Sequence, residues 1–220
     1  MSRVLPELYE ARFDEREVSA KDGVWREIVR YLERWIDPAA PVLDVACDRG
    51  HFIRWVNATE RWATDIRDVQ ASLPPDVRFV QASGLALEEA VPVSYFGTVF
   101  MSNYLEHLDS SDAVIEQLRV AAQLLKPGGR VIVLQPNIRL VGPHYWDFID
   151  HRVALTERSL LEAAEMAGLQ TVDLITRFIP YSTKGRLPTA APLVRAYLRF
   201  RPAWWVLGRQ SLYIGTRARD

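Results

Sequence analysis

The sequence predicts an α/β protein with a doubly wound, mostly parallel seven-stranded sheet and helices on both faces. Three observations predict this fold. Short apolar segments rich in β-branched residues alternate with helical patterns along most of the chain, as is typical of parallel sheets covered on both faces. Two more strand-like segments follow near the C-terminal end. No internal repeat or low-complexity tract interrupts this order.

The predicted strands are short and almost continuously apolar. Five come first and two come late, over residues 42–46, 61–66, 77–80, 98–103 and 130–136, and then 169–179 and 210–216. Apolar runs of this length between turn-forming residues favour buried strands over helices.

Helical patterns fill the connections between these strands. The expected helices are one or two before Trp35, one that His51 opens in the segment HFIRWV, one over Ser110–Leu125, and one over Thr156–Ala167. Serine or threonine caps, the stop Lys126-Pro127-Gly128-Gly129, and Gly168 set the ends of the last two helices. The connection from Arg67 to Asp76 contains two prolines and has room for a short helix only.

Length and composition predict a single domain. The 220 residues are 49% hydrophobic and 25% charged, which is ordinary for one globular unit. We expect N-terminal helices over 1–36, a cofactor-binding core over 40–137, and a region with the last two strands over 138–220, which contains a basic insert at 180–208. The single cysteine, the charged N-terminal segment and the lack of long apolar runs predict a cytoplasmic protein.

The first predicted strand ends in a loop suited to a ligand. Ligands of doubly wound sheets bind beyond the carboxyl ends of the strands. Here the strand runs into Asp44-Val45-Ala46-Cys47-Asp48-Arg49-Gly50, and Asp65 ends the second strand 21 residues after Asp44. A carboxylate at about this offset accepts hydrogen bonds from a ribose diol. By itself this pattern fits both S-adenosylmethionine and a dinucleotide.

Four motifs together resemble the class I S-adenosylmethionine-dependent methyltransferases. VLDVACDRGHF resembles the first motif of this family, ATDIR its second-strand motif, FGTVFMSNYLEHL its fourth-strand motif and LLKPGGRVIVLQPN its fifth. The order and spacing match over about residues 40–137. The segment after residue 143 is similar to small-molecule methyltransferases, and the C-terminal part to bacterial members associated with sugar and polysaccharide biosynthesis. The resemblance implies a Rossmann-like methyltransferase fold.

The resemblance also implies a set of cofactor-binding residues. The methionine part of S-adenosylmethionine would lie against the first loop, the ribose on an acid at the end of the second strand, and the adenine between that strand and the next. S-adenosylhomocysteine would be the product. The implied residues are Asp44, Ala46, Cys47, Asp48 and Gly50; Asp65 and Ile66; Ser83, Gly84 and Leu85; and Ser102 and Asn103 near the sulfonium.

Several residues depart from the family pattern. Ala46 and Asp48 stand where the family has its first and middle glycines, and Asp48 adds both bulk and a negative charge. Its charge would attract the cationic cofactor, whereas its bulk would fill the pocket. Ser83 replaces an acid that commonly contacts adenine, and Gly97 replaces another common acid at a position that is more often structural. The alternative function is therefore a catalytically inactive, methyltransferase-like binding protein with a decayed cofactor site.

Three histidines are candidate catalytic residues for methylation of a hydroxyl. Histidine is suited to remove the hydroxyl proton because its ordinary pKa lies near neutrality. His107 follows the fourth strand, and His144 and His151 follow the fifth, so we expect all three at the rim of the cleft. Each also has a structural explanation, as loop cap or partner of a neighbouring Asp. His51 is interpreted as structural.

The sequence favours neither a metal site nor a nucleophilic cysteine. A metal site built from His107, His144, His151 and nearby acids is an alternative, but methyl transfer requires no metal and no ligand spacing indicates one. Cys47 lies inside the cofactor loop without a histidine nearby in sequence, so we interpret it as a packing residue.

The C-terminal part of the chain is strongly basic. It has nine Lys and Arg residues and no acid between Leu174 and Arg219, although the net charge of the chain is −1. Arginines interleaved with aromatic residues over 193–209 fit an anionic or phosphate-linked acceptor, a peripheral membrane contact, or a packing helix with a solvated basic face. The expected acceptor is a small molecule or glycan, and no nucleic acid is expected because the chain has no RNA-binding module. A nicotinamide oxidoreductase is disfavoured because the first loop lacks G-x-G-x-x-G spacing.

Overall fold

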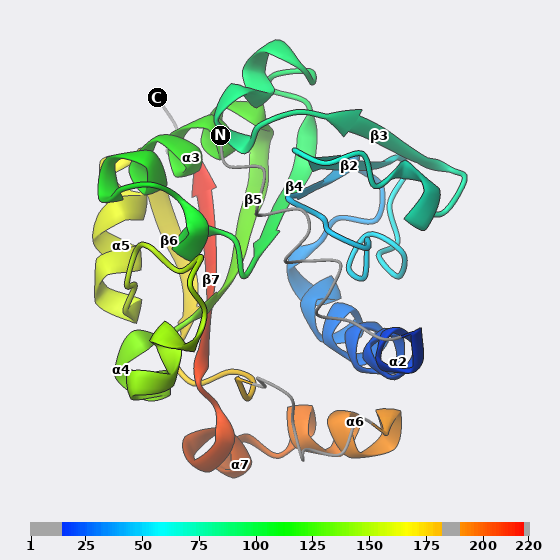
Figure 1. Ribbon diagram of the computed structural model, residues 1–220. Coiled ribbons are helices and arrows are strands. Elements are labelled where there is room, and N and C mark those ends of the chain that lie inside the picture. Colours follow the sequence, from blue (N-terminus) through cyan, green and yellow to red (C-terminus); the bar gives the residue numbers. More distant parts are fainter. Residues whose placement is uncertain (1–14, 182–189, 218–220) are drawn as a thin grey trace.

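The seven predicted strands form one sheet, and the predicted fold class is confirmed (Figure 1). The computed structural model describes residues 15–181 and 190–217. The strand order is β3-β2-β1-β4-β5-β7-β6, in which β1 to β5 run parallel and β7 runs antiparallel to both β5 and β6. The strands are β1 (Val42–Val45), β2 (Arg61–Asp65), β3 (Val77–Gln81), β4 (Phe96–Ser102), β5 (Leu125–Pro136), β6 (Leu169–Ile175) and β7 (Gln210–Arg217).

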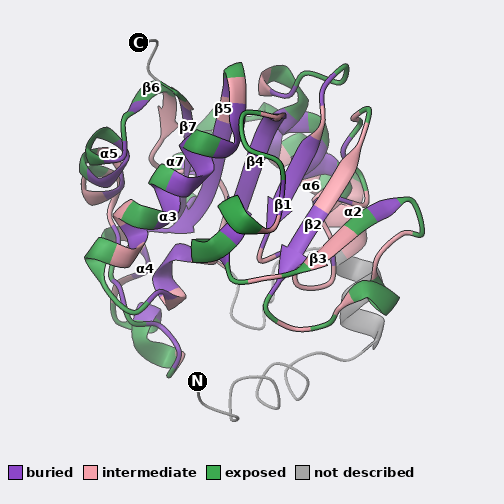
Figure 2. Ribbon diagram, turned by 90° about the horizontal axis from the view of Figure 1, so that it is seen from above, coloured by how far each residue is buried: buried purple, intermediate pink, exposed green. Residues whose placement is uncertain are grey.

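Helices cover both faces of this sheet (Figures 1 and 2). The α-helices are α2 (Glu15–Leu32), α3 (Ser111–Leu124), α4 (Ile138–Val141), α5 (Glu157–Met166), α6 (Ala191–Arg199) and α7 (Arg201–Leu207). Short 3-10 helices are η1 (Glu33–Trp35), η2 (Gln70–Ser72), η3 (Gly84–Glu89), η4 (Leu105–His107) and η5 (Gly142–Asp147). One apolar core lies between the sheet and α3 with α5, and a second lies between the sheet and α2 with α6 and α7.

Successive side chains along a strand contribute in turn to the two apolar cores. In β5, Val131 and Val133 belong to the core under α3, whereas Ile132 and Leu134 belong to the core under α2. Successive side chains of a strand point to opposite faces, so a strand between two helical layers must be apolar at every position. This requirement explains the continuous apolar runs in the sequence.

The two clearest predicted helices end as their cap residues require. The Ser110 side chain accepts a hydrogen bond from the Ala113 amide at the start of α3. Thr156 and Ser159 form a reciprocal capping box at the start of α5, and Gly168 follows the end of that helix with a φ of 78°. The start of α3 and both ends of α5 therefore follow from local hydrogen bonding and backbone sterics.

The helix expected after the first strand does not form, and this prediction was wrong. Residues 51–55 form turns, with helix-like bonds from Arg54 N to Gly50 O (3.0 Å) and from Val56 N to Phe52 O (3.2 Å). The connection from the end of β1 to the start of β2 has 15 residues, which is little more than the dozen or so that a crossover between parallel strands needs. The turn still packs as a helix would, because Phe52 is buried and stacks on Phe100.

Several strand bounds also differ from the prediction. β6 ends at Ile175 rather than at residue 179, and beyond it the chain keeps a hydrogen bond to the start of β7, from Phe178 N to Gln210 O (2.8 Å). β4 and β5 begin earlier than predicted, since Phe96 pairs with Leu125 ahead of a register shift. Gly97 lies so close to Ala40 that any added Cβ would overlap it, which supports a structural reason for glycine there.

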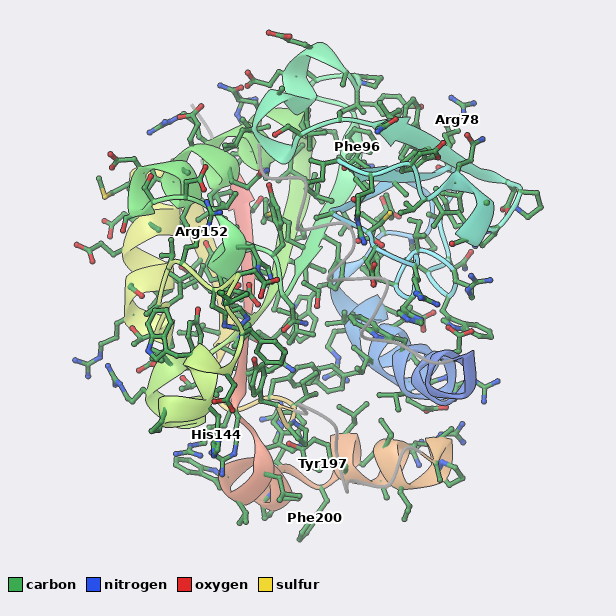
Figure 3. The ribbon with its side chains drawn as sticks, viewed as in Figure 1. Arg78, Phe96, His144, Arg152, Tyr197 and Phe200 are labelled. Atoms are coloured by element: carbon green, nitrogen blue, oxygen red, sulfur yellow. The ribbon has the colours of Figure 1, made fainter. Side chains whose placement is uncertain are left out.

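The basic insert forms two short helices that pack on α2. Leu198 of α6 and Trp204 of α7 are buried, and Arg195 makes two 2.8 Å hydrogen bonds to the buried carboxylate of Glu27. The packing interpretation of this segment is therefore confirmed for residues 190–207. Figure 3 nevertheless shows Phe200 on the outer side of these helices, and Trp205 is also exposed. Among residues 15–181 and 190–217, no helix is both long and apolar enough to cross a bilayer.

Candidate active site

The candidate site lies at the carboxyl ends of β1, β2 and β4. These three strands are neighbours in the sheet and run in the same direction. The loops that follow them, beginning at Ala46, Ile66 and Asn103, therefore meet at one edge. This edge, where the strand order reverses, is the usual ligand position of a doubly wound sheet.

The first loop adopts the left-handed backbone that three glycines would favour. The φ angles of Ala46, Asp48 and Gly50 are 54°, 48° and 70°. For a residue with a Cβ, this conformation costs roughly 1–2 kcal/mol. The chain thus keeps the backbone form of a glycine-rich loop although two of the three glycines are replaced. Strain of this kind is typical of functional sites.

Gly50 is the position in this loop where a side chain fits least. An added Cβ would overlap the Cδ2 atom of Leu73 and lie 3.2 Å from Ile53 Cγ2. We expect Gly50→Ala to lower the free energy of unfolding by roughly 2–4 kcal/mol, from left-handed strain and overpacking together. Urea unfolding measures this change.

Gly168→Ala is the matched control for that prediction. Gly168 also has a positive φ, of 78°, but an added Cβ there meets no atom within 4 Å. We expect this variant to lose only about 1 kcal/mol from backbone strain. If the free energy of unfolding falls equally in the two variants, the overlap with Leu73 does not contribute to the loss of stability.

Three carboxylates and one guanidinium lie together beneath this loop. Asp65 Oδ2 accepts a 3.1 Å hydrogen bond from the Asp48 amide, and Arg67 bonds to Asp65 Oδ1 (3.0 Å) and Asp48 Oδ1 (2.9 Å). Burial raises the pKa of Asp44 well above its ordinary value, and the charges of Asp65 and Asp48 raise it further. Arg67 therefore neutralises part of an acidic site and occupies the carboxylate predicted to bind ribose.

The residues predicted to bind adenine include exposed apolar side chains and a glycine that lies against Tyr104. Ile66 and Leu85 are large apolar side chains left exposed, and Ser83 is exposed beside them in sequence. Gly84 is buried, and an added Cβ would overlap the Tyr104 hydroxyl, which donates a 2.9 Å hydrogen bond to Gln117. Exposed apolar side chains at such an edge are suited to pack against a flat ring.

Ser102 is the last residue of β4 and Asn103 is the first residue after it, and both were predicted to lie near the sulfonium. Asn103 has a φ of 47°, and its backbone amide bonds to Leu134 O of β5 (2.9 Å). Its side chain donates a 2.9 Å hydrogen bond to the Ser102 hydroxyl. The chain then turns into η4, which carries Glu106 and His107.

His107 is held by its Nδ1 atom. Nδ1 lies 3.1 Å from the carbonyl oxygen of Asp150 and 3.5 Å from its Oδ2. A carbonyl oxygen only accepts hydrogen bonds, so neutral His107 carries its proton on Nδ1 and its basic nitrogen is Nε2. Nε2 lies 3.9 Å from Oε1 of Glu106, a side chain that is 1% exposed.

His151 lies beside His107, whereas His144 does not. The rings of His107 and His151 meet edge to face with their centroids 5.0 Å apart. The His144 side chain is 74% exposed and bonds to Asp147 (2.9 Å). Figure 3 shows His144 near α7, well apart from Arg152, which follows His151 in the chain.

The two residues interpreted as structural occupy packing positions. His51 bonds to Asp22 (2.8 Å) and stacks on Trp25. Cys47 is buried, and burial with nearby negative charges raises the pKa of its thiol far above the ordinary range. A thiol that resists ionisation is a poor nucleophile.

Sequence reasoning missed four residues that the structure brings into this site. All four adjoin predicted residues, and the charges of Arg67, Glu106 and Asp150 beside Ile66, His107 and His151 were a usable signal. Their contacts were not predictable, because Tyr104 meets Gly84 and Asp150 meets His107, 20 and 43 residues away.

The chain matches the model of a known protein family. A family model described as a methyltransferase domain matches residues 16–174. No curated protein matches the sequence.

Solved methyltransferase structures share the fold at low sequence identity. A Haloferax volcanii methyltransferase in complex with the Trm112 methyltransferase activator superposes with a TM-score of 0.65 and 17% identity, covering 94% of this chain and 95% of that one. A SAM-dependent methyltransferase of Archaeoglobus fulgidus gives 0.62 and 17%, covering 87% and 94%. One from Mesorhizobium loti gives 0.61 and 16%, covering 86% and 96%.

Proposed function

The chain belongs to the methyltransferase-domain family, and from this premise we propose that it methylates a hydroxyl group of a small molecule or glycan. It is an S-adenosylmethionine-dependent enzyme. The observation that carries the cofactor site is the left-handed backbone at residues 46, 48 and 50 directly above the buried carboxylate of Asp65. S-adenosylmethionine, when bound, supplies a methyl group already activated by its cationic sulfur.

The residues at this edge of the sheet fit the parts of that cofactor. Asp48 places negative charge where the cationic groups of the cofactor would lie, the buried Asp44 would line the same loop, and Asp65 would bind the ribose hydroxyls. The exposed side chains of Ile66 and Leu85 offer apolar surface to adenine. The complete proposed set is Asp44, Ala46, Cys47, Asp48, Gly50, Asp65, Ile66, Ser83, Gly84, Leu85, Ser102 and Asn103.

Arg67 would compete with the cofactor for Asp65. Its bonds to Asp65 must open before ribose hydroxyls can bind that carboxylate. We expect Arg67→Gln to tighten binding of S-adenosylmethionine by roughly 3- to 10-fold, because it frees Asp65 and makes the site more negative. Calorimetric titration measures this change.

S-adenosylhomocysteine is the control ligand for the effect of charge on cofactor binding. S-adenosylhomocysteine lacks the sulfonium charge, so Arg67→Gln should favour S-adenosylmethionine over this product by a larger ratio than the wild type does. Arg119→Gln, on the exposed surface of α3, is the matched substitution. Weaker binding of both ligands by one common factor would mean that Arg67 supports the loop instead of competing.

Hydroxyl chemistry is supported by the arrangement around His107. Nε2 of His107 would accept the proton of the acceptor hydroxyl as the methyl group is transferred, and the Asp150 carbonyl holds Nδ1–H in place. The Asp150 carboxylate, 3.5 Å away, would stabilise the imidazolium that results. His151, packed against His107, would shape the acceptor side of the site. His144 is the third candidate, from the exposed rim.

A transfer screen tests the acceptor class. Incubation with tritiated-methyl S-adenosylmethionine and sugars, nucleotide-sugars, lipid-linked glycans or small phenols should label one hydroxyl-bearing class. The basic residues and the exposed Phe200 and Trp205 near the insert favour an anionic, phosphate-linked acceptor or peripheral membrane contact. We place the reaction in the cytoplasm. Labelling of amine-bearing acceptors alone would contradict the hydroxyl assignment.

A further inference from the structure

Two segments far apart in sequence are joined at η4. The amides of Arg152 and Val153 donate hydrogen bonds of 2.8 and 3.1 Å to the carbonyl oxygen of Glu106. These bonds tie the turn after β4 to the chain that leads into α5. They hold the side chains of Glu106, His107 and His151 on one spot, although 44 residues separate the two histidines.

These three side chains present metal-ligating atoms to one another. One carboxylate oxygen of Glu106 and one ring nitrogen from each of His107 and His151 all lie within 4.8 Å of one another. Glu106 is 1% exposed and His151 is 9% exposed. The group is therefore built into the interior and is unlike the solvated acids of an ordinary surface.

The carboxylate of Glu106 lacks the partners that a buried carboxylate requires. Its Oε2 atom is buried without a hydrogen bond, and among the described residues no Lys or Arg forms an ion pair with Glu106. Both polar atoms of the Gln135 side chain, also buried, lack hydrogen bonds as well. Buried polar groups are almost always satisfied, and an ion is one explanation when they are not.

The two imidazoles are held by contacts with neighbouring residues. The contact between His107 Nδ1 and the Asp150 carbonyl leaves Nε2 facing Glu106. Metal-binding histidines usually donate their other ring N–H in this way. The ring of His151 packs against Tyr145 and Phe148, with centroids 4.8 and 5.2 Å away.

We propose that Glu106, His107 and His151 bind a divalent transition-metal ion, with Zn²⁺ favoured by the donor set. Two imidazoles and one carboxylate with a remaining open position are the ligands of catalytic zinc sites. Zinc requires ligand atoms roughly 3.3 Å apart, so from separations of up to 4.8 Å the side chains close by up to about 1.5 Å on binding. In the ion-bound protein Nε2 of His107 is a ligand instead of a base.

What the ion does rests on the proposed function. At its open position it binds an oxygen of the acceptor. A bound divalent ion lowers the pKa of a hydroxyl ligand, so the ion takes over the task that His107 performs in the ion-free protein. Binding of the ion itself requires neither cofactor nor acceptor.

Zinc titration of the chelator-treated full-length protein tests the site. Isothermal titration with ZnCl₂ alone should show one equivalent bound by the wild type. Glu106→Gln and His151→Gln should each weaken zinc binding by at least about 100-fold, since loss of a ligand costs more than loss of a supporting hydrogen bond. MgCl₂, which prefers oxygen ligands, should bind far more weakly.

His144→Gln is the matched control, because it removes an exposed histidine outside the group. We expect its zinc affinity to equal that of the wild type. If circular dichroism shows that Glu106→Gln or His151→Gln does not fold, His107→Gln is used in its place, because the His107 side chain is partly exposed. Absence of zinc binding by the wild type, or wild-type affinity in the ligand variants, overturns the proposal. Since no cofactor is present in the titration, either result leaves the methyltransferase assignment in place.

Discussion

His107→Gln should lower kcat at least about 100-fold while the affinity for S-adenosylmethionine changes less than about twofold. A positioned acid or base contributes roughly 10²- to 10⁴-fold to a rate, and glutamine keeps a polar side chain without a basic nitrogen. His107 lies on η4, whereas the proposed cofactor residues lie on the loops before it. Tritiated-methyl transfer at saturating cofactor measures kcat, and calorimetry measures cofactor affinity.

Asp150→Asn distinguishes chemistry at His107 from a merely structural effect. The Asp150 carboxylate lies 3.5 Å from Nδ1 of His107, where it would stabilise the imidazolium formed during transfer. Without that charge kcat should fall, whereas the thermal midpoint and the affinity for S-adenosylmethionine should stay near those of the wild type. A kcat that either His107→Gln or Asp150→Asn leaves unchanged removes His107 from proton transfer.

Asp65→Asn should weaken binding of S-adenosylmethionine by roughly 10- to 100-fold. Hydrogen bonds to a charged group contribute about 1.5–3 kcal/mol, and asparagine replaces one acceptor oxygen with a donor. Asp65 is 4% exposed and also receives the Asp48 amide, so the substitution disturbs the loop as well as the ribose contact. Calorimetric titration gives the affinity, and the thermal midpoint reports on the fold.

Asp68→Asn is the matched control for the ribose contact. Asp68 is exposed three residues further on and accepts a hydrogen bond only locally, from the Gln70 amide. We expect this variant to bind the cofactor as the wild type does. Equal affinities for Asp65→Asn and wild type would exclude Asp65 from the cofactor site.

Local patterns in the sequence predicted most of the elements correctly. The caps of α3 and α5 depend on hydrogen bonds between residues three apart, so their signal is local. The helix expected after β1 failed because periodicity says nothing about the space available between two paired strands. β6 was predicted too long for a similar reason, since its end depends on where β7 begins.

The candidate site was predictable only in part. Residues that follow strand ends, such as Asp44 and Asp65, were found because strand order alone places them at one edge. Arg67 was overlooked because nothing in the sequence shows that its guanidinium bridges Asp48 and Asp65. The three histidines were predicted at one rim, but only His107 and His151 lie together.

The sequence by itself determined the doubly wound sheet and the family to which the chain belongs. Strands that alternate with helices, cap residues and motif order are properties of residues close together in sequence. They depend on short-range sterics and hydrogen bonds, so they can be predicted from the sequence. Only the tertiary structure decided that Arg67 covers Asp65 and that Glu106, His107 and His151 lie together. Such contacts join residues through backbone hydrogen bonds and packing between distant segments, so their partners cannot be read from spacing along the chain.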